Sequence, residues 1–452
     1  MELHPILEQG NPPAPNLWYV LSAMGDSPSM RVGHTCTYIP SHDPDGGSGK
    51  LYVIGGANPD GAFAETCVLD LDTFTWDVCD ATGLKARYEH SAFVPQNDPT
   101  KIYVFGGAHQ GSNHNDVQQF DTVKQTWTTV AVNGAAPSPR TYHTAACVGD
   151  QFIVYSGGQC GSEPVGDRQV YSFDATTHTW STLNVRGDSP KPRHGHLVVP
   201  VGNKIFVHGG MSGTTFYNDL YILDLKSKTW TSVKQKKGSP SARAAHSGVV
   251  FDSHLYVFAG MNRDGALDDA YKLNIETLKW SKVQLEGPPP ACRLDFGMCT
   301  VRLHVTVAPP GGTDMMVTGK QAKEYLEQQL SRYSSAGSTR SLASSYGSAG
   351  SVSHDDCILD LPSSPSHNAP ADSQSTQLPD AAAATCDGDC AVAMAMPDSL
   401  PPLPHVTVEM CLVMGGMDTE GEMFDDTLVM LLEEAGSGVG VNGEGKGEGT
   451  EG

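Results

Sequence analysis

The sequence LYVIGG at residues 51–56 is the first of six related stretches, and the first five follow one another at intervals of about fifty residues. The other copies are IYVFGG at 102–107, IVYSGG at 153–158, IFVHGG at 205–210, LYVFAG at 255–260 and CLVMGG at 411–416. Each is an apolar run, rich in β-branched and aromatic residues, that stops at glycine. This pattern indicates an innermost packed β-strand ending in a sharp turn. The repetition predicts an all-β protein built from one recurring unit.

Tryptophan recurs in register with the glycine pairs. One tryptophan follows each of the first five pairs by about twenty residues, and a sixth precedes all repeats. Because a repeat of about fifty residues with four short strands is typical of a kelch blade, the chain resembles the kelch-repeat propeller family. The residues predicted to be structural are Trp18, Trp76, Trp127, Trp180, Trp230 and Trp280, with Gly55, Gly56, Gly106, Gly107, Gly157, Gly158, Gly209, Gly210, Gly260, Gly415 and Gly416.

The sixth repeat has no tryptophan of its own after Gly416. Trp18 belongs to no repeat, so we expect it to supply the outer strand of the sixth blade. This closure would leave no open sheet edge. The sequence therefore predicts a six-bladed β-propeller closed by an N-terminal strand, over residues 16–304 and 406–432, after an N-terminal arm at residues 1–15.

Residues 305–405 interrupt the sixth repeat and differ from it in composition. They contain only three aromatic residues, and serine occupies ten of the positions from 331 to 353. Because such a segment has little apolar surface to bury, we predict a disordered insert, with one short helix possible at 318–333. The glycine- and glutamate-rich tail, residues 433–452, is predicted to be disordered for the same reason.

The formal net charge of −22 argues against nucleic-acid binding and against adsorption on anionic lipid. We find no apolar run long enough to span a membrane and no signal peptide. The eleven cysteines include no C-x-x-C pair, and Cys386 with Cys390 offers too few ligands for zinc. We expect a cytoplasmic protein with reduced thiols, without metal or cofactor and without direct membrane insertion.

An Arg-x-x-His motif opens each of the first five repeats, and the sixth repeat has Phe296 in place of the histidine. Equivalent positions in six blades would place the arginines in a ring suited to capturing carboxylates. The alternative is that each arginine pairs with an acid of a neighbouring blade, such as Asp116 or Asp219. The predicted partner-binding residues are Arg31, Arg87, Arg140, Arg193, Arg243 and Arg293, with Tyr88, Tyr142 and His194 as wall residues.

The histidines of the motif are predicted to bridge neighbouring blades through hydrogen bonds rather than to bind metal. They are His34, His90, His143, His196 and His246. We find no motif that supports catalysis. The iron site E-x-x-x-D-x-x-x-H of some plant kelch proteins is matched by Asp174 and His178 but has Val170 where glutamate is required. The chain is therefore predicted not to be an enzyme.

Several longer strings resemble the family of Rab effector proteins with kelch motifs. They are WYVLSAMGDSPSMRVGHTCTYIP at 18–40, YVIGGANPDGAF at 52–63, RYEHSAFVP at 87–95, SPRTYHTAACVGDQFIVYSGG at 138–158, PRHGH at 192–196 and LVMGGMDTEGEMFDD at 412–426. The resemblance implies binding to a GTP-loaded Rab GTPase of late endosomes, peripheral association with endosome membranes, and support of transport from endosomes to the trans-Golgi network. The alternative is a kelch substrate receptor of a ubiquitin ligase that reads acidic or C-terminal peptides, although the chain has no BTB domain.

Overall fold

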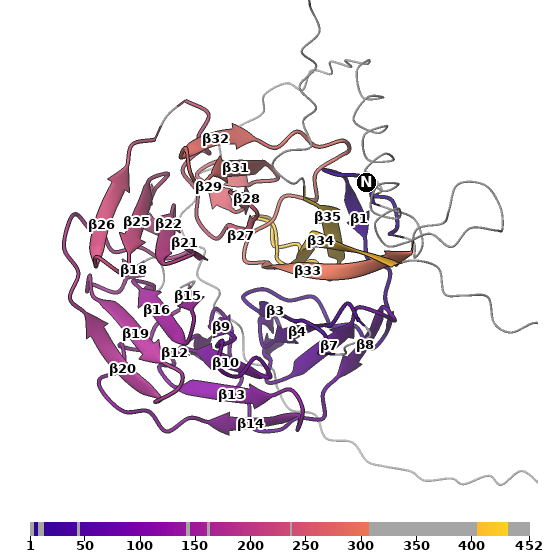
Figure 1. Cartoon of the computed structure of the whole chain (residues 1–452), viewed down its shortest axis with the longest axis horizontal. Helices are drawn as coiled ribbons and strands as arrows, with labels where there is room; N and C mark the ends of the chain where they lie inside the picture. The colour runs from indigo at the N-terminus through magenta and orange to yellow at the C-terminus, as the bar shows by residue number, and fades with distance from the viewer. Residues whose placement is uncertain are drawn as a thin grey trace, which may run out of the picture. The chain divides into compact units, whose positions relative to one another are not determined.

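The computed structural model describes residues 4–7, 13–42, 46–141, 145–160, 163–235, 237–306 and 405–432. In these residues, antiparallel sheets of four main strands are arranged as six blades around a central axis (Figure 1). From the axis outward, the first three blades are β3 (Thr35–Ile39), β4 (Lys50–Ile54), β7 (Thr66–Asp70) and β8 (Thr75–Val78); β9 (Ser91–Phe93), β10 (Lys101–Phe105), β13 (Val117–Asp121) and β14 (Thr126–Thr129); and β15 (Ala145–Val148), β16 (Gln151–Tyr155), β19 (Val170–Asp174) and β20 (Thr179–Leu183).

The remaining three blades follow the same order. They are β21 (Leu197–Val201), β22 (Lys204–His208), β25 (Leu220–Asp224) and β26 (Thr229–Val233); β27 (Ser247–Phe251), β28 (His254–Phe258), β31 (Ala270–Asn274) and β32 (Lys279–Lys282); and β33 (Gly297–Thr306), β34 (His405–Met414), β35 (Thr427–Leu431) and β1 (Trp18–Val20). The prediction of a six-bladed all-β propeller closed by an N-terminal strand is confirmed.

The runs that precede the glycine pairs form the second strand of each blade, and the prediction that they are innermost is wrong. In blade one, β3 lies between β4 and the axis. A second strand has a strand on each side and a neighbouring blade against each face, so residues Leu51–Ile54 are all buried. Burial on both faces explains why these segments are continuously apolar rather than alternating.

Blade six closes the ring through the N-terminal segment. Trp18 of β1 pairs with Met430 of β35, and its side chain is 1% exposed. The indole meets the ring of Phe258 in blade five edge to face, with centroids 5.4 Å apart. Two parts of the chain more than four hundred residues apart therefore complete one sheet, as predicted.

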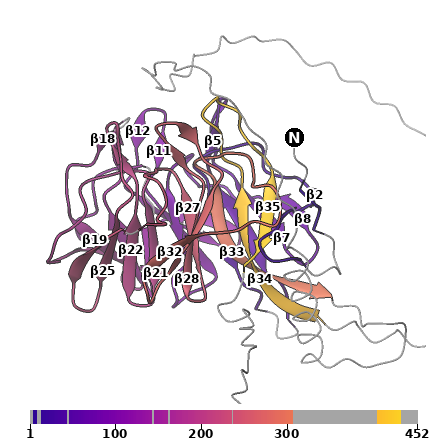
Figure 2. The ribbon, with the colours of Figure 1, turned by 90° about the horizontal axis from the view of Figure 1, so that it is seen from above.

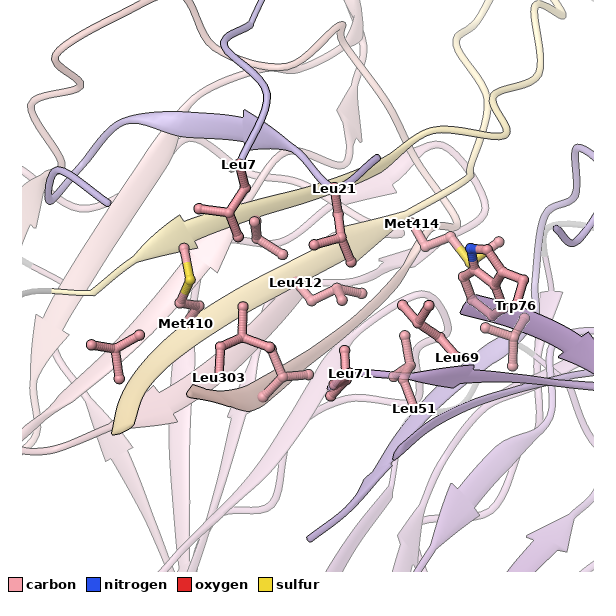
Figure 3. Packing of buried hydrophobic residues seen from close by; sticks show 14 of the residues in the cluster. Leu7, Leu21, Leu51, Leu69, Leu71, Trp76, Leu303, Met410, Leu412 and Met414 are labelled. Atoms are coloured by element: carbon pink, nitrogen blue, oxygen red, sulfur yellow. The ribbon is translucent and has the colours of Figure 1, made fainter. Parts of the chain in front are cut away.

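The last interblade core lies at the seam between blades six and one. Figure 3 shows Leu303, Met410 and Leu412 of blade six in one cluster with Leu51 and Leu69 of blade one. Leu7 and Leu21 of the N-terminal segment cover the outer part of this cluster. Residues before the first strand thus take part in closing the ring.

A tryptophan of the outermost strand lies in each of the six interblade cores. Trp76 lies between blades six and one, Trp127 between one and two, Trp180 between two and three, Trp230 between three and four, Trp280 between four and five, and Trp18 between five and six. The Trp127 indole N–H donates to Thr66 Oγ1 of blade one at 3.0 Å. The regular spacing of tryptophan in the sequence therefore marks where neighbouring blades meet.

The two ends of the propeller differ. Short hairpins follow the second strands at one end, where Figure 2 shows β5, β11, β12 and β18. The long β33 and β34 pair with each other from Gly297↔Met414 to Thr306↔His405, and they extend toward the other end of the propeller (Figure 2). Residues 307–404 of the predicted insert lie outside the part of the chain that the structure describes. So do the helix at 318–333, Cys386, Cys390 and the tail.

Among the described residues, no helix is long and apolar enough to cross a membrane. The cysteines described without a disulfide partner are Cys36, Cys67, Cys79, Cys147, Cys292, Cys299 and Cys411.

Candidate functional site

Each blade holds one arginine whose guanidinium is buried. It begins the Arg-x-x-His motif, or its variant in blade six, and is at most 1% exposed. Its Nη1 donates to the carbonyl that follows the second strand of the same blade, at 2.8–3.0 Å. The donors and acceptors are Arg31 to Gly55, Arg87 to Gly106, Arg140 to Ser156, Arg193 to Gly209, Arg243 to Ala259 and Arg293 to Gly415.

The same guanidinium forms an ion pair with an acidic residue at the start of the third strand. The pairs are Arg31–Glu65, Arg87–Asp116, Arg140–Asp167, Arg193–Asp219, Arg243–Asp269 and Arg293–Asp426. In the last five pairs, the nitrogen and oxygen are 2.5–3.2 Å apart. The hypothesis of pairing with a neighbouring blade is wrong, because each acid belongs to the arginine's own blade. Each arginine thereby links the beginning of its blade to the second and third strands.

Electrostatics at the Arg87–Asp116 pair favours the ionised acid. Burial opposes ionisation of Asp116, yet Arg87 and Lys85 together hold the pKa of this carboxyl below its ordinary value. Three of the guanidiniums also lie over aromatic rings from the hairpins, namely Phe63, Tyr217 and Phe424, at 4.2, 4.3 and 4.6 Å from the ring centroid. The assignment of the six arginines as partner-binding residues stays a prediction. Their guanidiniums are turned into the blades and offer almost no surface.

The arginine backbone joins one blade to the previous one. In every blade the second residue of the glycine pair donates its N–H to the arginine carbonyl of the next blade, at 2.8–3.0 Å. The six bonds are Gly56 to Arg87, Gly107 to Arg140, Gly157 to Arg193, Gly210 to Arg243, Gly260 to Arg293 and Gly416 to Arg31. The last of these crosses the seam, so the set forms a closed ring.

The glycine pair of blade three begins one residue earlier than predicted. Ser156 accepts the Arg140 hydrogen bond and Gly157 donates to Arg193, so these two residues correspond to Gly55 and Gly56. Gly158 belongs instead to the hairpin strand β17 (Gly158–Cys160). In blade five, Ala259 takes the first position with a φ of 51°, close to the 60° of Gly55. The backbone geometry is therefore kept where the glycine is lost.

Three of the motif histidines, His90, His196 and His246, form the predicted contacts with a neighbouring blade, whereas no such hydrogen bond is formed by the buried ring of His34. His90 Nε2 lies 3.2 Å from Thr35 Oγ1 of blade one, and His196 Nε2 lies 3.0 Å from the Tyr155 carbonyl oxygen of blade three. His246 Nε2 lies 3.0 Å from Nδ1 of His208 in blade four. His143 lies outside the described residues. Phe296 takes the histidine position in blade six and is buried against blade five.

Burial keeps the motif histidine His34 neutral. Its pKa falls to about 3, mainly through desolvation and further through Arg31. The pKa of His208 also falls to about 3, through burial and then through Arg243 and Arg193. These rings serve as neutral packing and bridging groups. Among the described residues, no group of three or more His, Cys, Asp or Glu side chains is placed to hold a metal ion.

The predicted wall residues have different outcomes. The backbone of Tyr88 pairs with Ala108 and its side chain is half-buried, while His194 pairs with Met211 and its side chain is 5% exposed. Tyr142 lies outside the described residues. Their role in binding stays a prediction.

In the blades where the structure describes it, the third residue of the motif takes part in a series of backbone hydrogen bonds between blades that the sequence analysis missed. The Gly33 N–H donates to the Asp295 carbonyl at 3.0 Å, and the Asp295 N–H donates to the Ala245 carbonyl at 3.2 Å. Burial raises the pKa of the Asp295 carboxyl to about 7. The residue type changes from blade to blade, so the only signal in the sequence is the constant distance from arginine.

A second missed position follows the glycine pair directly. It is occupied by Ala57, Ala108, Gly158, Met211, Met261 and Met417. Each of these residues forms a backbone bridge to the second residue of the motif in its own blade, as Met261 does to Ala244. The three methionines are half-buried and lie on consecutive blades.

A hollow of about 450 Å³ lies between blades four and five at the end away from the hairpins. Its lining includes Lys204, Asp224, Lys226 and Glu276. This mixture of charges does not define one class of ligand.

Comparison with known proteins agrees with the architecture. A family model described as the KLHDC2/KLHL20/DRC7 Kelch-repeats domain matches residues 13–164 and 45–260, and a Kelch motif model matches residues 242–284. Proteins named "Rab9 effector protein with kelch motifs" are also similar. The protein from Bos taurus is 47% identical over 221 residues, the one from Homo sapiens 45% over 223, and the one from Danio rerio 43% over 231.

Each alignment covers 49% of this chain, together with 59% of the Bos taurus and Homo sapiens proteins and 66% of the Danio rerio protein. The chain thus spans about three fifths of the length of these curated relatives. The matched models together extend over more than half of the chain and agree with the six blades that the structure shows. The chain belongs to the kelch-repeat family of β-propeller proteins.

Proposed function

We propose that this chain is a non-enzymatic interaction module that binds a Rab GTPase, with Rab9 as the first candidate. The observation that carries the proposal is the identity of 43–47% to proteins named Rab9 effector. The blades support it physically. Buried ion pairs and interblade hydrogen bonds hold a rigid ring, whereas the hairpins differ in sequence from blade to blade. A rigid scaffold with variable connections is suited to partner recognition.

The GTP-bound state of the Rab is the proposed ligand. The γ-phosphate of GTP orders the switch loops of a GTPase, and an effector that touches those loops binds the ordered state better. In this proposal the protein attaches peripherally to endosomes through the Rab and supports transport from endosomes to the trans-Golgi network. Neither role requires a cofactor.

The test is calorimetric titration of the whole chain with Rab9 loaded with a non-hydrolysable GTP analogue or with GDP. We expect binding at least about 10-fold tighter to the GTP form, which corresponds to about 1.4 kcal/mol. Equal affinity for both forms would exclude an effector role. Binding to neither form would exclude Rab9 as the partner.

The substrate-receptor alternative receives less support from the geometry. A basic pocket for acidic or C-terminal peptides needs accessible cations, and the six arginines of the ring are buried and each forms an ion pair within its own blade. Co-purification of a cullin with the tagged chain from cells, retained after a high-salt wash, would revive this alternative.

A further inference from the structure

The hairpins at the arginine end form a continuous surface over blades four to six. In blades four and five they are β23 (Met211–Ser212) with β24 (Thr215–Phe216), and β29 (Met261–Asn262) with β30 (Gly265–Ala266). In blade six the loop is closed by a bridge between Met417 and Met423.

Hydrogen bonds connect these hairpins across the blades. Arg263 Nη2 of blade five donates to the Thr214 carbonyl of blade four at 3.4 Å. The Ala266 N–H donates to Thr419 Oγ1 of blade six at 3.4 Å. Neighbouring hairpins therefore lie side by side, and one partner can contact all three.

Methionine is concentrated on this half of the ring. Met211, Met261 and Met417 occupy the position after the glycine pair, where blades one to three have only alanine or glycine, and Met423 lies beside Met417. All four side chains are half-buried. We refer to these four residues as the methionine arc. Methionine is flexible and polarisable, so it adapts to the shape of a partner.

Acidic residues are frequent in the loops of blades five and six that carry Met261, Met417 and Met423. They are Asp264, Asp268, Asp418, Glu420, Glu422 and Asp425. All except Asp418 are exposed, and Asp418 accepts the N–H groups of Glu420 and Glu422 within its own loop. The only basic residue of these two loops is Arg263, which donates to Thr214. We call these six acids the acidic rim.

We infer that the methionine arc and the acidic rim are the docking surface for a segment of the Rab GTPase that presents apolar side chains flanked by lysine or arginine. An apolar centre bordered by one sign of charge selects a partner of that composition, because like charges at the border are repelled. The buried arginines then stabilise the hairpins from below rather than contacting the partner. This inference rests on the proposed function.

The test compares Rab9 binding, in the GTP-analogue form, to the whole chain and to the double variant Met261→Gln/Met417→Gln. Glutamine keeps the side-chain length and removes the apolar end. We expect binding to weaken at least tenfold with an unchanged melting temperature. The matched control is Met24→Gln, because Met24 is 73% exposed on β2 (Met24–Gly25) at the outer edge of blade one. The control should bind as the unmodified chain does.

A second variant tests the charge without touching the arc. Asp264→Lys/Glu420→Lys/Glu422→Lys reverses three exposed charges and should weaken binding at least tenfold, with a smaller dependence on salt. The control is Asp60→Lys on the exposed turn of blade one between β5 (Ala57–Asn58) and β6 (Gly61–Ala62). Methyl NMR of methionine-labelled protein gives a readout that needs no variant. Addition of Rab9 should shift the four arc methyls and leave Met24 unchanged.

The outcomes separate the two proposals. Tight GTP-selective binding by the unmodified chain and by both arc and rim variants would overturn the docking surface while the effector function stands. Shifts at Met24 rather than at the arc would do the same. Absence of Rab9 binding by the unmodified chain would overturn the effector function itself, and with it the partner assigned to this surface.

Discussion

At the residue scale, the buried arginine is the group on which each blade depends. Arg243 is 0% exposed and holds Asp269 with two nitrogens, at 2.7 and 3.2 Å, while it also donates to the Ala259 carbonyl at 2.9 Å. Removing a buried guanidinium leaves both the carboxylate and the carbonyl without this partner. Such a loss is large because the remaining charge is still partly desolvated.

We predict that Arg243→Ala lowers the free energy of unfolding by about 3–5 kcal/mol. The measurement is urea unfolding monitored by circular dichroism. Lys279→Ala, on the exposed side of β32, is the control and should change stability by no more than about 0.5 kcal/mol. Equal stability of the two variants would show that the ion pair is unimportant for folding and would return this arginine to the candidates for direct binding.

The buried His34 leads to a prediction on pH. Its pKa is about 3 in the fold and about 6.5 in an unfolded chain, so the unfolded state takes up the proton first as the pH falls. The free energy of unfolding therefore carries no penalty from His34 well above pH 6.5, and the penalty grows progressively from pH 6.5 down to about 3. At pH 5 this histidine alone lowers the free energy of unfolding by about 2 kcal/mol.

The variant His34→Phe isolates this effect, because blade six carries Phe296 at the same position. Unfolding free energies are measured at pH 7.5 and pH 5 for both proteins. His208, whose pKa is lowered, and Asp295, whose carboxyl pKa is raised and which acts in the opposite sense, remain in both proteins. The variant should lose about 2 kcal/mol less than the unmodified chain over this interval. An identical loss would mean that His34 titrates normally in the fold.

At the element scale, β1 is the strand that completes blade six. It pairs with β35 over three residues, and Trp18 fills the core between blades five and six. Three backbone pairings alone are a weak attachment. The buried indole adds a large apolar contact that helps to hold this strand in place.

We predict that Trp18→Ala lowers stability by about 3–5 kcal/mol, and that removal of residues 1–24 gives markedly destabilised or insoluble protein. Differential scanning fluorimetry is the measurement. Met24→Ala is the control, because this exposed side chain on β2 makes little contact, and its melting temperature should stay unchanged. A truncated protein with the melting temperature of the full chain would show that the ring closes without β1.

At the scale of the whole molecule, the ring is joined across positions 306 and 405. Thr306 and His405 are paired at the ends of β33 and β34. A two-residue turn can therefore connect these strands, since such turns join adjacent antiparallel strands. The pairing predicts that the blade can form without residues 307–404, which belong to the insert predicted at 305–405.

We predict that replacing residues 307–404 by Asn-Gly leaves the melting temperature equal or slightly higher, because closing a shorter loop costs less entropy. The proposed binding to Rab9 should also be retained, because the hairpins lie at the other end of the propeller. Thermal unfolding and calorimetry measure the two properties. A large loss of stability would assign the segment a structural role, and a selective loss of binding would assign it a part in partner recognition.

Much of this architecture was predictable from the order of residues. Runs such as LYVIGG mark a strand and its turn within a few neighbouring residues, and the number of runs predicts the number of blades. The unassigned Trp18 indicated how the ring closes. Other features could not be read in this way. The Ser156 carbonyl accepts the Arg140 hydrogen bond, which identifies Ser156 as the residue in the first glycine position. A search for paired glycines finds Gly157 and Gly158 instead.

Exposure of the candidate site was decided by tertiary structure alone. In sequence, Arg193 and Met211 are equally plausible surface residues near one end of a blade. In the fold, Asp219 pairs with the arginine and Tyr217 lies over it, whereas Met211 remains half-exposed. Strand patterns arise from contacts between close neighbours in the chain, so the sequence carries them. Burial depends on which distant segments cover a side chain, and that is determined only when the blades close into a ring.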